Sequence, residues 1–316
     1  MIDACKPDLS RFIMVFFMLL LVGSNPAVAG ETRKTPHLRF FGFTLVDVGH
    51  DDPLDQVAKT NYLDEVAGFT NMADILVVKP ENIVSRMEAM KSLAVKPYVH
   101  VYPLFFEQTG SDGPSGSKYT LRKDYREQWS LFISRNSLKT RQKDLAAFYL
   151  GEEPTWNGIS AGDLRAASDM IKATVPRVPI LIVEAYPSIA ELEVPKSADW
   201  VGFDRYFVKN PAKDPTYLKE FALLKSKLSS PRQKLVVVMD AHYRPDAHGA
   251  FGLSASDMTN VALSYFDLAK SDPKVVALFA YMWPGGFDGP ETMGARQLSR
   301  KTRRAYELIG KAITAK

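Results

Sequence analysis

Short apolar segments and longer amphipathic segments alternate along most of the chain. Eight of the apolar segments have the length of buried strands and are rich in branched and aromatic residues. They lie at residues 38–46, 73–78, 96–104, 146–151, 179–183, 199–203, 234–239 and 275–282. Strands that are apolar nearly throughout are typical of a parallel sheet with helices on its faces. The alternation therefore predicts an α/β fold with eight parallel strands.

Two folds are compatible with this pattern, an eightfold β/α (TIM) barrel and a doubly wound open sheet. About 250 residues are typical of the barrel, which suits this 316-residue chain once its N-terminal segment is set aside. An open sheet usually carries a phosphate-binding glycine fingerprint after an early strand, and Gly42 and Gly49 do not form one. We therefore expect a single barrel domain at residues 30–316.

Residues 1–29 have the pattern of a secretory signal peptide. Lys6 and Arg11 give a basic start, residues 12–22 form an apolar run, and small residues lead up to Ala29. The run is shorter than the roughly 20 residues of a membrane span, so a retained anchor is the weaker alternative. We expect cleavage near Ala29 and a bacterial periplasmic or secreted protein with no stable membrane insertion.

The cysteine, charge and histidine patterns argue against several function classes. The single cysteine, Cys5, precedes the apolar run, so the mature chain has neither a disulfide framework nor a thiolate nucleophile. The net charge of +4 is spread along the chain, and we expect no nucleic-acid partner. No phosphate loop, Rossmann fingerprint, nucleophile elbow or His-x-His pair occurs. Asp240 and His242 could begin a metal site, but we favour hydrogen bonding and expect neither a metal nor a cofactor.

Most of the predicted strands end in an ionisable or aromatic side chain. The C-terminal strand ends of a β/α barrel meet at one rim, where the chemistry of such proteins takes place. These residues are Asp47, Lys79, Tyr102, Glu152 with Glu153, Glu184, Asp204 with Tyr206, Asp240 with His242, and Trp283. A lone strand-end acid is usually a helix cap or an ion-pair partner. Several acids together with aromatic rings indicate a sugar site, because rings stack on sugar faces and carboxylates accept hydrogen bonds from hydroxyls.

The fourth predicted strand ends in Glu152-Glu153-Pro154. This resembles the (β/α)8-barrel glycoside hydrolases whose fourth strand ends in Asn-Glu-Pro, where that Glu is the general acid/base. Glu153 and Pro154 match the motif, whereas Glu152 stands in place of the Asn. Those enzymes carry a nucleophilic Glu at the end of strand seven, where this chain has Asp240. They tend to carry a Trp at the end of strand eight, where Trp283 matches.

The resemblance implies an exported glycoside hydrolase that cleaves an oligo- or polysaccharide with two carboxylates. Glu153 is expected to be the acid and Asp240 its catalytic partner. Because Asp is one methylene shorter than Glu, a wider gap between the two carboxyl groups and an inverting route are possible. Glu184 and Asp204 stay open as partners, since either can point into the same barrel mouth. The residues expected to bind substrate are Asp47, Tyr102, Glu152, Glu184, Asp204, Tyr206, His242 and Trp283. We expect the protein to act as a monomer.

Two other functions fit the same residues. The absent Asn before Glu153 and the absent Glu on strand seven also suit a catalytically impaired barrel that binds glycan or cell-wall material. A lysine-dependent or metal-dependent barrel enzyme is the third possibility. It would use Lys79 as a Schiff-base nucleophile, although an ion pair is the simpler reading of that side chain.

Overall fold

The computed structural model describes residues 36–315, so the predicted signal peptide and its cleavage site lie outside the described residues. The described chain forms one sheet of eight parallel strands and a separate antiparallel hairpin. The sheet strands are β1 (Phe40–Phe43), β2 (Met72–Leu76), β3 (Lys96–His100), β6 (Ala147–Glu152), β7 (Ile180–Ala185), β8 (Trp200–Asp204), β9 (Lys234–Asp240) and β10 (Val275–Tyr281). The hairpin strands are β4 (Phe106–Gly110) and β5 (Lys118–Leu121).

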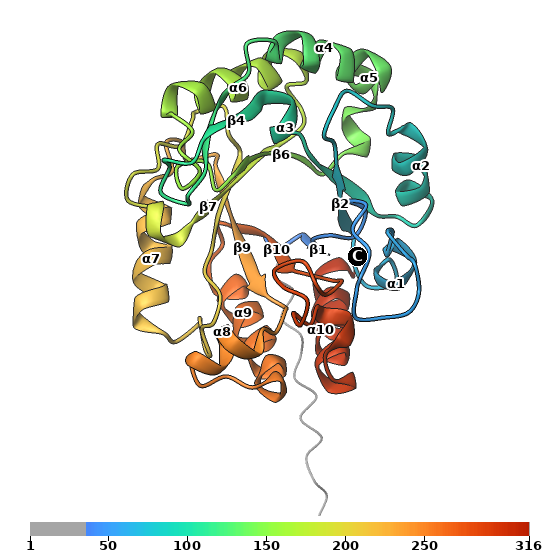
Figure 1. The fold of residues 1–316 in the computed structure, drawn as a ribbon, viewed down its shortest axis with the longest axis vertical. Helices are drawn as coiled ribbons and strands as arrows, with labels where there is room; N and C mark the ends of the chain where they lie inside the picture. Colours follow the sequence, from blue (N-terminus) through green and yellow to red (C-terminus); the bar gives the residue numbers. More distant parts are fainter. Residues whose placement is uncertain (1–35, 316) are drawn as a thin grey trace, which may run out of the picture. The chain divides into compact units, whose positions relative to one another are not determined.

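The helices lie around the outside of the ring of strands (Figure 1). They are α1 (Leu63–Val66), α2 (Val84–Ser92), α3 (Tyr102–Phe105), α4 (Tyr125–Arg135), α5 (Leu138–Arg141), α6 (Ala161–Thr174), α7 (Pro215–Ser226), α8 (Pro245–Ala250), α9 (Met258–Ser271) and α10 (Arg300–Thr314). Ser160 caps the N-terminus of α6, since its hydroxyl accepts the N–H of Asp163 at 3.0 Å. Among residues 36–315, no helix combines the length and the apolar character needed to cross a membrane.

Neighbouring strands follow the order β1-β10-β9-β8-β7-β6-β3-β2, and every pairing between them is parallel. The first two strands of the chain therefore stand at the two ends of the order and meet each other in the ring (Figure 1). A doubly wound sheet would instead leave these strands in its middle. The predicted eightfold β/α barrel is confirmed.

Two segments beside the barrel have little regular structure of their own. Residues 107–118 form most of the hairpin of β4 and β5, with Gly110 at the end of β4 and Gly113, Pro114 and Gly116 in the turn. The short helix α1 is preceded by a long polar loop. Asp52 holds this loop in place by accepting the N–H of Gly285, which follows β10, at 2.9 Å.

Side chains close the barrel between β1 and β2. The two oxygens of Asp74 each accept a backbone N–H at 2.7 Å, one from Leu45 and one from Val46. Asp74 is fully buried, so these bonds replace the hydration that its carboxylate loses. Gly42 of β1 allows the close approach, because a Cβ there would lie 2.2 Å from the carbonyl oxygen of Met72. Asn71 adds further bonds across the seam, since its side-chain oxygen accepts the N–H of Phe41 at 3.0 Å. One buried acid, one amide side chain and one glycine thus hold the seam.

Alternate residues of each strand belong to two separate apolar cores. In β7, Ile180 and Ile182 pack outward among the helices, whereas Leu181 and Val183 pack inside the barrel. This alternation with a period of two follows from the pleat of the strands. It also determines which strand-end side chains face the barrel interior.

We predict that Asp74→Ala lowers the free energy of unfolding by about 2–5 kcal/mol, because it leaves the buried N–H groups of Leu45 and Val46 without an acceptor. Chemical denaturation at neutral pH measures the loss. Asp64→Ala is the control, since Asp64 is an exposed acid paired with Lys59, and its removal should cost about 1 kcal/mol or less. Equal losses in the two variants would show that Asp74 does not hold the seam.

Candidate functional site

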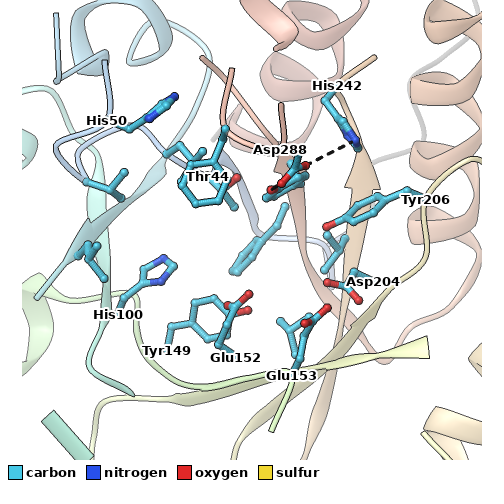
Figure 2. A pocket seen from close by; sticks show the side chains of 18 of the residues that line it. Thr44, His50, His100, Tyr149, Glu152, Glu153, Asp204, Tyr206, His242 and Asp288 are labelled. Atoms are coloured by element: carbon cyan, nitrogen blue, oxygen red, sulfur yellow. Dashed lines mark hydrogen bonds and ion pairs between the residues drawn. The ribbon is translucent and has the colours of Figure 1, made fainter. Parts of the chain in front are cut away.

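A cavity of about 640 Å³ opens at the carboxyl ends of the strands (Figure 2). Its walls combine acids, aromatic rings and histidines. The carboxyl groups belong to Glu152, Glu153, Asp204 and Asp288. The rings and imidazoles belong to His50, His100, Tyr102, Tyr149, Tyr206, Phe207, His242, Phe279, Tyr281 and Phe287. This is the side of a β/α barrel on which active sites are found.

A bulge in β6 turns Glu152 toward the cavity. Tyr149 pairs with Leu181 of β7, but Gly151 pairs with the next residue, Ile182, so one residue of β6 has no partner. The extra residue shifts the alternation, and Glu152 lies beside the inward-facing Val183. Without the bulge, Glu152 would face the helices, because successive side chains of a strand point to opposite sides.

Glu153 faces the same cavity because its backbone is left-handed, with φ of 46°. Its N–H still donates to the carbonyl of Val183 at 2.8 Å, so the residue stays attached to the sheet. Residues other than glycine rarely adopt this conformation, which costs of the order of 1 kcal/mol and is concentrated at functional sites. The two adjacent glutamates thus reach one cavity through two separate departures from regular strand geometry.

Asp204 ends β8 on the interior side, two residues after Gly202 and four after the inward-packed Trp200. Its carboxyl group lines the same cavity as that of Glu153, and Figure 2 shows the two groups side by side on one wall. Burial and the charge of Glu152 raise the pKa of Glu153 to about 7. Burial and the charge of Glu153 raise the pKa of Asp204 well above its ordinary value. The Glu153–Asp204 pair therefore keeps protons to higher pH than isolated carboxyl groups do.

Tyrosines surround these carboxyl groups. Tyr206 and Tyr281 stack with ring centroids 5.2 Å apart and an interplanar angle of 25°. Burial and the charge of Glu152 raise the pKa of Tyr102 to about 12, so it remains a neutral donor. Such rings offer flat faces to sugar rings and hydroxyl groups to their polar edges.

Asp288 enters the cavity from the loop after β10, opposite the Glu153–Asp204 pair (Figure 2). The Tyr281 hydroxyl donates to its carboxylate at 2.9 Å, and His242 Nε2 lies 4.0 Å away. Gly286, at φ of 77°, forms the tight part of this loop, and a Cβ there would lie 2.1 Å from Pro53. Sequence reasoning missed Asp288 because the residue lies in a loop, seven positions past the last residue of β10.

Thr44, His100, Tyr149 and Tyr281 are among the cavity residues that were not expected site residues. The period-two alternation could have found all four, because they continue the inward-facing positions of β1, β3, β6 and β10. The cavity does contain six residues that the sequence pointed to: Tyr102, Glu152, Glu153, Asp204, Tyr206 and His242.

Three expected site residues do not line the cavity. Asp47 binds the guanidinium of Arg86 at 2.9 Å. Glu184 lies on the outward-facing side of β7 and is buried. Its carboxyl group accepts the N–H groups of Thr155, at 2.9 Å, and of Trp156, at 3.1 Å. Trp283 is 5% exposed and donates its indole N–H to Glu65 at 2.7 Å. All three have structural partners, and Tyr281 supplies the ring on β10 that Trp283 was expected to supply.

Asp240 also lies outside the cavity lining. It is fully buried, and its carboxylate accepts hydrogen bonds from the N–H of Phe207, at 2.8 Å, and from His248 Nε2, at 3.2 Å. His242 Nδ1 lies 3.2 Å from the same carboxylate. Burial disfavours ionisation of Asp240, but interactions with the two histidines outweigh burial and hold its pKa well below the ordinary value. Asp240 is therefore an ionised anchor for His242 rather than a group facing a substrate.

Asp240, His242 and His248 could also hold a metal ion, since their ligand atoms lie within 4.8 Å of one another. The backbone N–H of Arg244 donates to His248 Nδ1 at 2.9 Å, which places the ring proton on Nε2. That proton then donates to Asp240, so the nitrogen facing the carboxylate is not free to bind a metal. The hydrogen-bonding pattern of this cluster does not fit a metal centre.

Comparison with known proteins supports the fold and reveals no sequence relative. No protein-family model matches the chain, and no curated protein matches its sequence. A glucosidase from Croceicoccus marinus superimposes with a TM-score of 0.57 at 10% identity, over 87% of this chain and 66% of the other. A GH113 β-1,4-mannanase has a TM-score of 0.54 at 10% identity, over 87% and 99%. Xylanase 10B from Thermotoga maritima has a TM-score of 0.52 at 14% identity, over 89% and 97%.

This chain thus shares the β/α-barrel fold of these three structures, and the expected resemblance is confirmed at the level of the fold. At these identities the comparison shows a shared architecture, not a shared activity. The site must therefore be interpreted from its own residues.

We predict that Glu153→Gln stabilises the folded protein at about pH 8 by ~1–3 kcal/mol but not at about pH 4. The folded-state pKa of Glu153 is raised from 4.5 to about 7, so folding becomes less favourable as the pH rises through that interval. The amide removes this penalty. Thermal unfolding of both proteins across the pH range measures it, with the exposed Glu193→Gln as control. A shift of the same size at both pH values would contradict the raised pKa.

Proposed function

We propose that this protein is a glycoside hydrolase that cleaves an oligo- or polysaccharide with the Glu153–Asp204 pair. The observation that carries the proposal is a pair of adjacent carboxyl groups with raised pKa values on the wall of an aromatic-lined cavity, at the catalytic end of a β/α barrel. Glycoside hydrolysis requires one protonated and one ionised carboxyl group beside the scissile bond, and coupling within such a pair allows one member to keep its proton after the other has lost it.

Glu153 donates the proton to the leaving oxygen, since its pKa of about 7 keeps it protonated up to neutral pH. Asp204 is the second carboxyl group, and in its ionised form it stabilises the positive charge that develops at the sugar carbon. Tyr102, Tyr206 and Tyr281 orient the sugar rings. A water molecule then attacks the sugar carbon, which keeps the hydroxyl group, and the other proton of the water restores the protonated state of the carboxyl pair.

Asp204 replaces Asp240 as the proposed partner of Glu153. Asp240 has no path to a sugar in the cavity, because its oxygens accept the N–H of Phe207 and face His242 and His248. The Lys79 alternative has no support either, since Lys79 is exposed and outside the cavity lining. Export to the periplasm or beyond, cleavage near Ala29 and action as a monomer remain part of this proposal.

A catalytically impaired glycan-binding barrel is the competing function. The raised pKa of Glu153 favours the enzyme, because a group that only binds sugar hydroxyls has no need to retain a proton at pH 7. Strongly perturbed carboxyl groups in a cleft are typical of catalytic acids.

We predict that kcat/KM on a cleavable glycan falls as the pH rises through about 7, because the acid loses its proton. Glu153→Gln should lower kcat by about 10²–10⁴-fold, which is the usual contribution of a general acid. Glu152→Gln should move the alkaline fall toward lower pH, since the charge of Glu152 helps to raise the pKa of Glu153. Release of reducing ends across the pH range measures all three proteins.

Glu193→Gln is again the matched control, because it makes the same chemical change on an exposed residue. Full activity of Glu153→Gln would refute the proposed acid. An inactive wild-type protein that still binds glycan would favour the binding function instead.

A further inference from the structure

The cavity contains more carboxyl groups than hydrolysis requires. Two carboxyl groups suffice for glycosidic cleavage, and the Glu153–Asp204 pair supplies them. Glu152 and Asp288 are surplus to that pair and face the cavity from β6 and from the loop after β10 (Figure 2). Both lie at positions that required a local deviation of the backbone, a bulge for Glu152 and a tight glycine turn for Asp288.

Within the described residues, no lysine or arginine forms an ion pair with any of the four cavity carboxyl groups. Arg244 is the basic residue of the lining besides the histidines, and its guanidinium binds Asp246 at 3.0 Å. Burial is the main cause of the raised pKa of Glu153, and the charges of Glu152 and Asp288 add to it, so the acids repel one another. A cationic ligand would relieve this repulsion, whereas an anionic one would add to it.

His242 gives an independent indication of a ligand at this place. Its side chain is 1% exposed, and its Nε2 faces Asp288 at 4.0 Å without a hydrogen bond among residues 36–315. Its Nδ1 lies 3.2 Å from Asp240 but makes no hydrogen bond there, so neither ring nitrogen has a hydrogen-bond partner among residues 36–315. A buried imidazole without a hydrogen-bond partner, beside a carboxylate, suits a ligand that carries a hydroxyl group next to an ammonium group.

We propose that the substrate is a saccharide of hexosamine units with free amino groups, whose ammonium group binds between Glu152 and Asp288. The neighbouring sugar hydroxyl forms a hydrogen bond with His242 Nε2, and the rings stack on Tyr206 and Tyr281. This inference rests on the proposed glycosidase function and names its substrate class. An N-acetylated unit loses the positive charge, and a uronic acid unit is repelled by the cavity.

The test is the affinity of the full-length protein for matched oligosaccharides, measured by calorimetry. The Glu153→Gln variant is used so that the ligands remain intact. The probes are glucosamine and galactosamine oligomers, their N-acetylated forms and a galacturonic acid oligomer. We expect the free-amine forms to bind at least about tenfold more tightly than the N-acetylated forms, since a charge-assisted hydrogen bond contributes about that factor. The preference should weaken as salt is added.

Asp288→Asn and Glu152→Gln, each combined with Glu153→Gln, should reduce the preference for free amines by about tenfold. Asp267→Asn is the charge-matched control, because Asp267 is exposed on α9 and pairs with Lys270. Retention of the preference in both cavity variants would overturn the inference, as would equal or tighter binding of the N-acetylated forms.

Hydrolysis by the wild-type protein separates this inference from the proposed function. Cleavage of neutral glycans with no preference for free amines would overturn the inference and leave the glycosidase function intact. Selective binding of free-amine oligomers without cleavage would support the preference for free amines and overturn the glycosidase function. Cleavage of the free-amine oligomers alone would support both.

Discussion

The closure of the barrel between β1 and β2 is the interaction on which the rest of the structure depends. Asp74 is buried at this seam and accepts the N–H groups of Leu45 and Val46, while Gly42 lets the strands approach. Strand ends converge on one cavity only if the sheet is closed. The acids of β6 and β8 and the loop after β10 would otherwise lie along an open edge. The proposed chemistry therefore requires this buried carboxylate, although Asp74 itself does not line the cavity.

The site contains several features that lower the stability of the folded protein, and the packing of the surrounding barrel compensates for them. Glu153 has a left-handed backbone, and burial beside Glu152 raises its pKa. Each feature costs stability, of the order of 1–3 kcal/mol. The two apolar cores that flank every strand provide the compensating burial. Asp240 and Glu184 show the other solution for a buried acid, because each is satisfied by histidines or backbone N–H groups and stays clear of the cavity. The acid of the site therefore has a raised pKa and few hydrogen-bond donors, whereas the buried acids of the scaffold have histidine or backbone N–H donors.

The period-two alternation of a strand predicts the direction of some strand-end acids but not of others. The pleat of β7 places Glu184 with the outward-facing Ile180 and Ile182, so its absence from the cavity could have been predicted. Glu152 could not have been placed in this way, because a bulge in β6 reverses the alternation just before it. Asp288 belongs to a loop with no periodic signal, and only its anchoring through Asp52 and Gly285 brings it over the cavity.

The sequence by itself determined the class of fold and the general location of the site. Eight apolar segments separated by helices leave few ways to bury their surface, and parallel strands bring their carboxyl ends to one edge. Tertiary structure decided which acids lie together. The proximity of Glu153, which follows β6, to Asp204 of β8 depends on the order of the strands in the closed ring, on the β6 bulge and on the left-handed backbone of Glu153 itself. It also decided that Asp240 supports His242 instead of facing the cavity. Side-chain direction and burial depend on contacts between residues far apart in the chain, which no local pattern contains.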